Sequence, residues 1–113
     1  DPKRITRDAT EVEKYINDPL IFHEAGKAGL GVALLNAIAD IKPKFDGFDY
    51  PVLIMHGGVD TITNNEGSKA LYTNSTSKDK ILKIWEGAYH EIFNETNKAE
   101  VIEFMINWLK QRI

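Results

Sequence analysis

One continuous apolar run, Pro51-Val52-Leu53-Ile54-Met55, limits the folds that this sequence can adopt. A run without alternation is typical of a strand covered on both faces, as in a parallel sheet packed between helices. The sequence predicts such a strand from Val52 to His56 and a second one from Lys80 to Trp85. A two-stranded parallel sheet is too narrow to be stable alone, and it leaves one edge of the apolar strand unpaired. We therefore expect further strands, supplied by another chain or by the upstream part of a larger α/β protein.

Two helices are expected before the first strand. Asp8 and Glu11 form a capping-box pattern that starts a short helix, and Asp18-Pro19 ends it. The second helix runs from about Lys27 to Ile41 and stops before Pro43. Its apolar residues recur along one face, as in an amphipathic helix; they are Leu30, Leu34, Ile38 and Ile41, with Leu35 beside them.

Two more helices are expected in the second half of the chain. Asn64 or Asn65 caps a helix that lies between the strands, so strand, helix and strand form a right-handed parallel crossover. The last helix runs from about Lys98 to Arg112 and is expected to bury Val101, Phe104, Met105, Trp108 and Leu109. The predicted order is therefore ααβαβα, an α/β fold of two parallel strands with flanking helices.

Composition excludes several classes of function. The chain has 14 Lys and Arg against 17 Asp and Glu, so its net charge of −3 offers no positive field for nucleic acid. It contains no cysteine, which excludes disulfides, a thiol nucleophile and Cys-based metal sites. Its three histidines lack the spacing of a zinc-binding helix. We expect no metal, no cofactor and no nucleic-acid partner.

Asp60 and His90 are the candidate catalytic residues, because each follows one of the two predicted strands. In open parallel sheets, sites form at the carboxyl ends of strands, and neighbouring strands bring such loops together. A carboxylate there can fix the tautomer of an imidazole and stabilise its cation, as the acid and base of a catalytic triad do. Position alone also allows plain structural roles, since Asp60 suits a turn after Gly57-Gly58.

Three stretches of the chain carry a resemblance to a known family. They are residues 18–38, which include Asp18-Pro19-Leu20 and Val32-Ala33-Leu34-Leu35-Asn36-Ala37-Ile38; the segment from Pro51 to Asp60; and the segment from Asp79 to His90. Together they resemble the C-terminal part of the monoacylglycerol lipase and lysophospholipase-like α/β-hydrolases. That family consists of serine esterases with a Ser-Asp-His triad and a helical cap over an acyl-binding channel.

The resemblance implies roles for individual residues. Asp60 would be the triad acid and His90 the triad base, and Leu34, Leu35 and Ile62 would lie near the acyl chain of a lipid ester substrate. Residues 1–45 would form the end of the cap region and the connecting helix, and residues 46–113 the C-terminal βαβα part of the core. Membrane contact, if the protein makes any, would come through the cap outside this chain, and the compartment is expected to be cytoplasmic or membrane-associated.

The chain also departs from the family pattern. It contains neither the Gly-x-Ser-x-Gly sequence that surrounds the nucleophile nor the upstream His-Gly motif of the oxyanion loop. Because the chain begins with Asp1 rather than Met, we interpret it as an expressed piece or a processed product. We expect it to be inactive alone and to need the upstream half of the hydrolase, or self-association through the open sheet edge.

The remaining candidate residues are given structural roles. Ser68, Ser75 and Ser77 have no elbow sequence around them and are expected at the surface. His23 and His56 are interpreted as structural histidines. A second function stays open from the sequence, a non-catalytic interaction module that binds a partner or itself through the open sheet edge.

Overall fold

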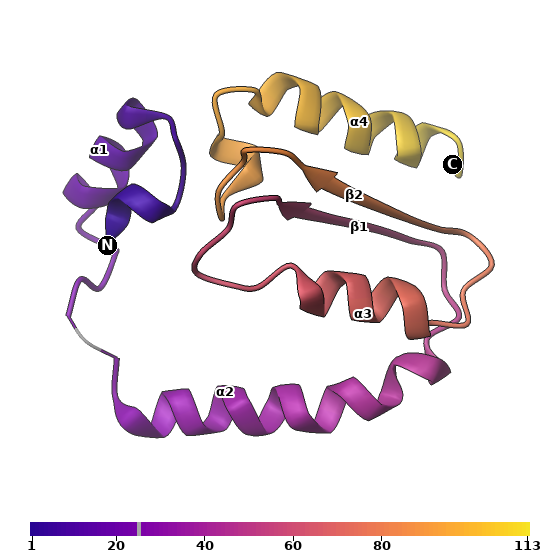
Figure 1. The fold of residues 1–113 in the computed structure, drawn as a ribbon. Coiled ribbons are helices and arrows are strands. Elements are labelled where there is room, and N and C mark those ends of the chain that lie inside the picture. The colour runs from indigo at the N-terminus through magenta and orange to yellow at the C-terminus, as the bar shows by residue number, and fades with distance from the viewer. Residues whose placement is uncertain (25) are drawn as a thin grey trace.

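A computed structural model describes residues 1–24 and 26–113 (Figure 1). The α-helices are α1 (Ala9–Asn17), α2 (Ala28–Ile41), α3 (Glu66–Asn74) and α4 (Lys98–Lys110), and the strands are β1 (Val52–Gly57) and β2 (Lys80–Trp85). The described residues also contain three short 3-10 helices: η1 (Pro2–Arg4), η2 (Lys42–Gly47) and η3 (Ile92–Asn94). The order of helices and strands is the predicted ααβαβα.

The two strands form a parallel sheet in which Val52 lies opposite Lys80 and Gly57 lies opposite Trp85. α3 lies on one side of this strand pair and α4 on the other, so the second half of the chain has three layers (Figure 1). Because the strands are parallel, their carboxyl ends lie side by side, and the loops that follow them meet there. Within the described residues, β1 has no partner strand on its outer edge.

The core lies between the sheet and α4. Trp85 and Val101 are buried there together with Ala88 and Ile92, and Met55 and Phe104 pack against this group. The Trp85 and Phe104 rings meet edge to face with centroids 5.7 Å apart. Residues from the loop after β2 therefore belong to the core itself, which fixes the start of that loop.

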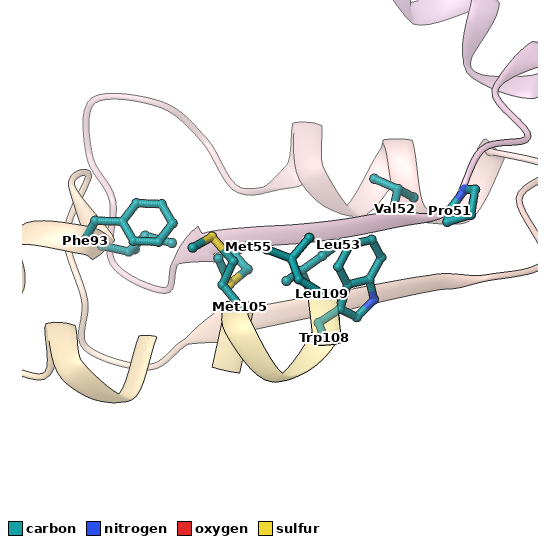
Figure 2. Close-up of a pocket in the computed structure, with 9 residues that line it drawn as sticks. Pro51, Val52, Leu53, Met55, Phe93, Met105, Trp108 and Leu109 are labelled. Atoms are coloured by element: carbon teal, nitrogen blue, oxygen red, sulfur yellow. The ribbon is translucent and has the colours of Figure 1, made fainter. Parts of the chain in front are cut away.

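Beside this core runs an open apolar groove of about 500 Å³ along the outer side of β1 and α4 (Figure 2). Its lining includes Leu53 and Met55 from β1 and Met105, Trp108 and Leu109 from α4. Burial of the whole apolar face of α4 was expected, but Leu109 is 42% exposed. The reason is that no described residue covers this side of β1.

A second apolar surface lies on α2, whose predicted apolar face forms as expected but is exposed. Leu34 and Leu35 are among its exposed side chains, and the helix runs below α3, away from the sheet (Figure 1). Within the described residues, no helix combines the length and apolar character that crossing a membrane requires.

Two local expectations are corrected by the structure. Asp8 caps α1 by accepting a hydrogen bond from the Thr10 amide, but Glu11 does not complete the capping box. Glu11 instead pairs with Lys14 at 3.0 Å and with Lys98 of α4 at 2.8 Å, which ties α1 to α4.

Ser75 and Ser77, expected at the surface, are buried between the end of α3 and the start of β2. The chain reverses direction there next to Phe48, whose carbonyl accepts hydrogen bonds from the Thr76 and Ser77 amides. Ser77 Oγ bonds within its own turn to the Asp79 carbonyl at 3.1 Å. Small hydroxyl side chains suit this tight turn. Both serines precede β2, at the opposite end of the sheet from Asp60 and His90.

Candidate active site

The loops after β1 and β2 are joined by backbone hydrogen bonds. The Gly58 amide donates to the Trp85 carbonyl at 2.8 Å, and the Val59 amide donates to the Ala88 carbonyl at 3.1 Å. Gly57 permits this close approach, since a Cβ atom on it would lie 1.9 Å from the Tyr89 carbonyl oxygen. The sequence at the strand ends therefore fixes the two loops side by side.

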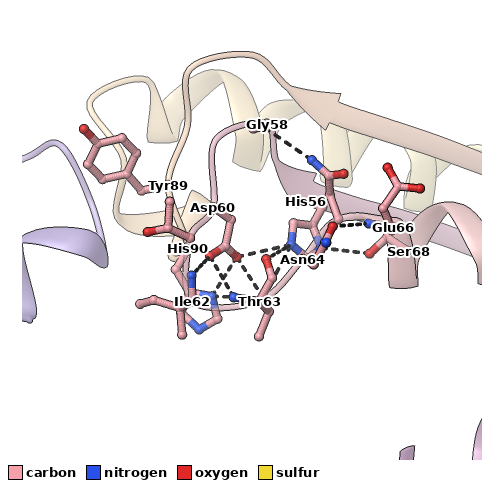
Figure 3. Close-up of polar contacts among 12 residues, drawn as sticks. His56, Gly58, Asp60, Ile62, Thr63, Asn64, Glu66, Ser68, Tyr89 and His90 are labelled. Atoms are coloured by element: carbon pink, nitrogen blue, oxygen red, sulfur yellow. Dashed lines mark hydrogen bonds and ion pairs between the residues drawn. The ribbon is translucent and has the colours of Figure 1, made fainter.

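This arrangement brings Asp60 and His90 into contact (Figure 3). His90 Nδ1 lies 2.9 Å from Asp60 Oδ2. The Asp60 side chain is 1% exposed, whereas that of His90 is 35% exposed. Because an ionised carboxylate can only accept, Nδ1 carries the hydrogen, and Nε2 of the neutral ring is left with its lone pair. Among the described residues, none hydrogen-bonds His90 Nε2.

The Asp60 carboxylate is held by its own loop as well. Oδ1 accepts hydrogen bonds from the Ile62 amide at 2.7 Å and the Thr63 amide at 3.0 Å, and Oδ2 accepts one from the Thr63 hydroxyl at 2.8 Å. Burial by itself would raise the pKa of Asp60, but the bonds from His90, Thr63 and Ile62 hold that pKa well below its usual value. Asp60 therefore stays charged at any pH near neutrality.

His56, at the end of β1, also reaches this carboxylate. Its Nε2 lies 3.2 Å from Asp60 Oδ2 and 3.2 Å from the Thr63 carbonyl oxygen, so Nε2 carries the hydrogen. Its Nδ1 then accepts the hydroxyl of Ser68 at 2.8 Å (Figure 3). Both nitrogens of His56 are satisfied, as expected for a structural histidine, but the contact with Asp60 was not expected.

Residues 1–97 match the model of a family described as serine aminopeptidase, S33. The chain belongs to this family. It is 33% identical to the monoglyceride lipase of Rattus norvegicus over 100% of the chain, which is 38% of that protein.

Two solved structures resemble the chain over nearly its whole length. The monoacylglycerol lipase of Paleococcus ferrophilus is 34% identical with a TM-score of 0.88, and 96% of this chain covers 42% of it. A soluble variant of monoglyceride lipase from Saccharomyces cerevisiae, solved in complex with a substrate analog, is 30% identical with a TM-score of 0.86. The match covers 100% of this chain and 42% of the yeast chain.

These similarities confirm the predicted fold class, an α/β-hydrolase fold with two parallel strands and flanking helices. They also confirm the resemblance to monoacylglycerol lipases. The chain spans about two fifths of the length of the relatives it matches, since it covers 38% of the rat protein and 42% of each solved structure.

Of the residues expected near an acyl chain, Ile62 contacts Asp60 through its amide, but no side chain of the three lines the space beside the Asp60–His90 pair. A small hollow of about 200 Å³ beside that pair is lined by Met55, His56, Asp60, Thr63, His90 and Ile92. Ile62 lies in the same loop as Asp60 but is 45% exposed and outside this lining. Leu34 and Leu35 lie on α2, also outside it.

No metal site accompanies the pair in the described part of the chain, where no group of three or more His, Asp or Glu side chains is arranged to hold an ion. Sequence reasoning did not find the supporting roles of Thr63, Ser68 and His56. A signal existed for the turn at Asp60, because an Asp in a loop commonly accepts a hydrogen bond from the amide two residues later, here that of Ile62, and Thr63 follows directly. Nothing in the sequence shows that Ser68, twelve residues after His56, contacts its ring.

Proposed function

We propose that this chain is the C-terminal portion of a serine hydrolase that cleaves carboxylic esters of monoacylglycerols or lysophospholipids. In that enzyme Asp60 is the triad acid and His90 the triad base. The observation that carries the proposal is the 2.9 Å contact of His90 Nδ1 with the buried carboxylate of Asp60, which leaves Nε2 free. Membership of the S33 family supports a serine hydrolase, and similarity to proteins named as monoglyceride lipases supports the monoacylglycerol substrate.

The tautomer of His90 dictates the chemistry. Nε2 takes the proton of a serine hydroxyl as the serine oxygen attacks the ester carbonyl, and it returns that proton to the leaving alcohol. Water then repeats both steps on the acyl-enzyme. Asp60 holds the ring and stabilises the imidazolium without itself becoming protonated. The serine and the oxyanion loop come from residues outside this chain, because no Gly-x-Ser-x-Gly occurs in it.

The upstream half of the hydrolase is proposed to pack on the outer edge of β1. The apolar groove along β1 and α4 supports this arrangement, since it is wide, apolar and continuous with the core. Residues 1–45 would then be the end of the cap region and the connecting helix, and residues 46–113 the last βαβα part of the core.

The acyl chain is proposed to lie against Leu34 and Leu35 of α2 and against Ile62. These three side chains are exposed in the present chain, so they are free to line a channel formed with the upstream half. Their apolar surface suits a hydrocarbon chain, whereas the polar ester end must reach His90.

The decisive experiment uses the complete hydrolase and the variant His90→Ala. We expect kcat with a monoacylglycerol to fall about 10⁴-fold, because the serine loses its base, while the protein stays folded. His23→Ala is the matched control, since His23 is exposed, its ring packs against Tyr15 of α1, and its loss should leave kcat unchanged. A folded His90→Ala enzyme that keeps the original kcat would show that the pair has no triad role.

The unpaired edge of β1 also fits the second function, a non-catalytic module that binds a partner through that edge. A module of this kind has no need of a buried carboxylate held to a half-exposed imidazole. Labelling of the complete protein with a serine-directed fluorophosphonate separates the two functions. The hydrolase is labelled at a serine outside this chain, and the module is not labelled.

A further inference from the structure

Glu95, five residues after His90, is a buried charge with no part in the triad chemistry. Its side chain is 0% exposed. Oε2 accepts a hydrogen bond from Arg7 Nε at 2.8 Å and one from the Thr96 amide at 3.1 Å. Oε1 accepts a hydrogen bond of 2.7 Å from the amide of Tyr89, the residue that directly precedes His90. The carboxylate therefore holds the Ala88–Tyr89 peptide, one residue before His90.

A buried, charged carboxylate destabilises the fold unless its oxygens accept hydrogen bonds and a counter-charge lies beside it. Burial raises the pKa of a carboxyl, yet the Tyr89 amide, Arg7 and the Thr96 amide together lower the pKa of Glu95 below its usual value. Glu95 is therefore charged in the folded protein. Buried ion pairs contribute little net stability compared with apolar side chains of similar size, so stability alone is a weak reason for this one.

Arg7 belongs to an N-terminal segment, residues 4–7, that is anchored along the loops of both site residues. The Ile5 carbonyl accepts the Glu91 amide at 2.7 Å, and the Thr6 hydroxyl donates to the Asn94 carbonyl at 2.8 Å. Arg4 hydrogen-bonds Thr61, the residue after Asp60. The segment leads directly into α1, so Arg7 and Glu95 connect the start of the helical region to the peptide before His90.

We propose that Glu95 is a positioning residue for His90, which acts by holding the Tyr89 amide, and that Arg7 supplies the counter-charge that keeps Glu95 in place. This inference rests on the proposed function of His90 as the triad base. The Asp60 bond fixes one nitrogen of the ring, whereas the Glu95 bond fixes the backbone one residue before it. Both are needed to aim Nε2 at a serine that lies on another part of the enzyme.

The principal test is Glu95→Gln in the complete hydrolase. The amide keeps the size of the side chain but removes its charge, leaving Arg7 unpaired and only one oxygen to accept from the Tyr89 amide. We expect kcat to fall about 10- to 100-fold while KM stays unchanged, because misplacing the base slows chemistry but not substrate binding. The matched control is Glu86→Gln, which removes the same charge from an exposed site four residues before His90. It should leave kcat unchanged.

Two further readouts distinguish positioning from a merely structural role. The downfield proton resonance of His90 Nδ1–H, identified by its absence in His90→Ala, should broaden in Glu95→Gln while circular dichroism stays unchanged. In the His90→Ala background, Glu95→Gln should cost no additional kcat, because the residue through which it acts is already gone. Should Glu95→Gln fail to fold, Arg7→Gln, which keeps the Tyr89 bond, takes its place, with the same direction and a smaller loss expected.

The inference is overturned if the folded variant keeps its kcat per titrated active site, or if its loss adds fully to that of His90→Ala. Failure of the proposed function looks different, because His90→Ala itself would then leave activity intact. A fall in the amount of folded protein with unchanged kcat per site would show that Glu95 only stabilises the fold.

Discussion

Asp60 accepts hydrogen bonds at both carboxylate oxygens from donors that approach on different sides. Two backbone amides and the Thr63 hydroxyl fix it within its loop, His56 contacts it at 3.2 Å, and His90 bonds it at 2.9 Å. A carboxylate held in this way cannot rotate to follow the imidazole. Asp60 therefore fixes the position of His90 Nδ1, and not the reverse.

Asp60→Asn in the complete hydrolase should lower kcat about 10³- to 10⁴-fold. The amide is almost the same size, but it can donate to His90 Nδ1 and so favour the wrong tautomer, and it cannot stabilise the imidazolium. His56→Ala should reduce the free energy of unfolding more than it reduces kcat. It removes the bonds of His56 to Ser68 and to the Thr63 carbonyl, but it takes only one weak donor from Asp60, which stays charged. Steady-state kinetics and urea denaturation of both variants check this, and a larger kcat loss for His56→Ala would contradict the choice of histidine.

Acid should destabilise the fold through Asp60 and Glu95. Both carboxyls have a pKa below the usual value in the folded state, so they resist protonation there while the unfolded chain binds protons at about pH 4. The free energy of unfolding is thus at its full value above about pH 5 and falls as the pH drops below it. Urea midpoints measured from pH 7 to pH 3 should show a smaller loss in Glu95→Gln than in the original protein, and an equal loss would contradict this.

At the scale of elements, the loops after β1 and β2 bring Asp60 and His90 together because they approach each other closely at Gly57. The Ala88–Tyr89 backbone runs where a side chain on residue 57 would be, with the Tyr89 oxygen 1.9 Å from an ideal Cβ position. Gly87 completes the turn after β2 with a φ of 71°, a conformation that favours glycine. The strand ends thus determine how far apart Asp60 and His90 lie.

Gly57→Ala should therefore displace the His90 loop from the end of β1. We expect a stability loss and, in the folded fraction of the complete hydrolase, a kcat reduced about 100-fold, because a shift of about 1 Å misaligns the base. Gly67→Ala is the control, since nothing lies within 4 Å of a Cβ atom there. Thermal denaturation with active-site titration checks the result, and equal behaviour of the two variants would contradict the role of Gly57.

The strands and helices could be predicted because their signals are local. The apolar run before His56, the Asp8 cap and the spacing of apolar residues in α4 each depend on a few neighbours in sequence. The approach of Asp60 to His90 was also predictable, since parallel neighbouring strands end together. The contact of Glu95 with Arg7 was not, because 88 residues separate them and Glu95 looks like any charged loop residue until the loops are folded.

For the whole molecule, the balance between buried and exposed apolar surface decides how the chain behaves alone. The core joins one face of the sheet to α4, while the outer edge of β1, its adjoining groove and the apolar face of α2 are uncovered by any described residue. Unpaired apolar strand edges readily accept another strand. The same surfaces that suit the upstream half of a hydrolase should therefore make this 113-residue chain associate with itself.

Sedimentation at micromolar concentration should thus show species larger than the 12.8 kDa monomer. Leu109→Glu places a charge in the groove beside β1 and should shift the population toward monomer, because an unpaired carboxylate is costly to bury. Leu20→Glu, at a side chain 91% exposed and outside the groove, adds the same charge and should leave the association unchanged. If the original chain sediments as a monomer and unfolds cooperatively, the outer edge of β1 needs no cover, and the proposed packing of an upstream half on this edge is contradicted.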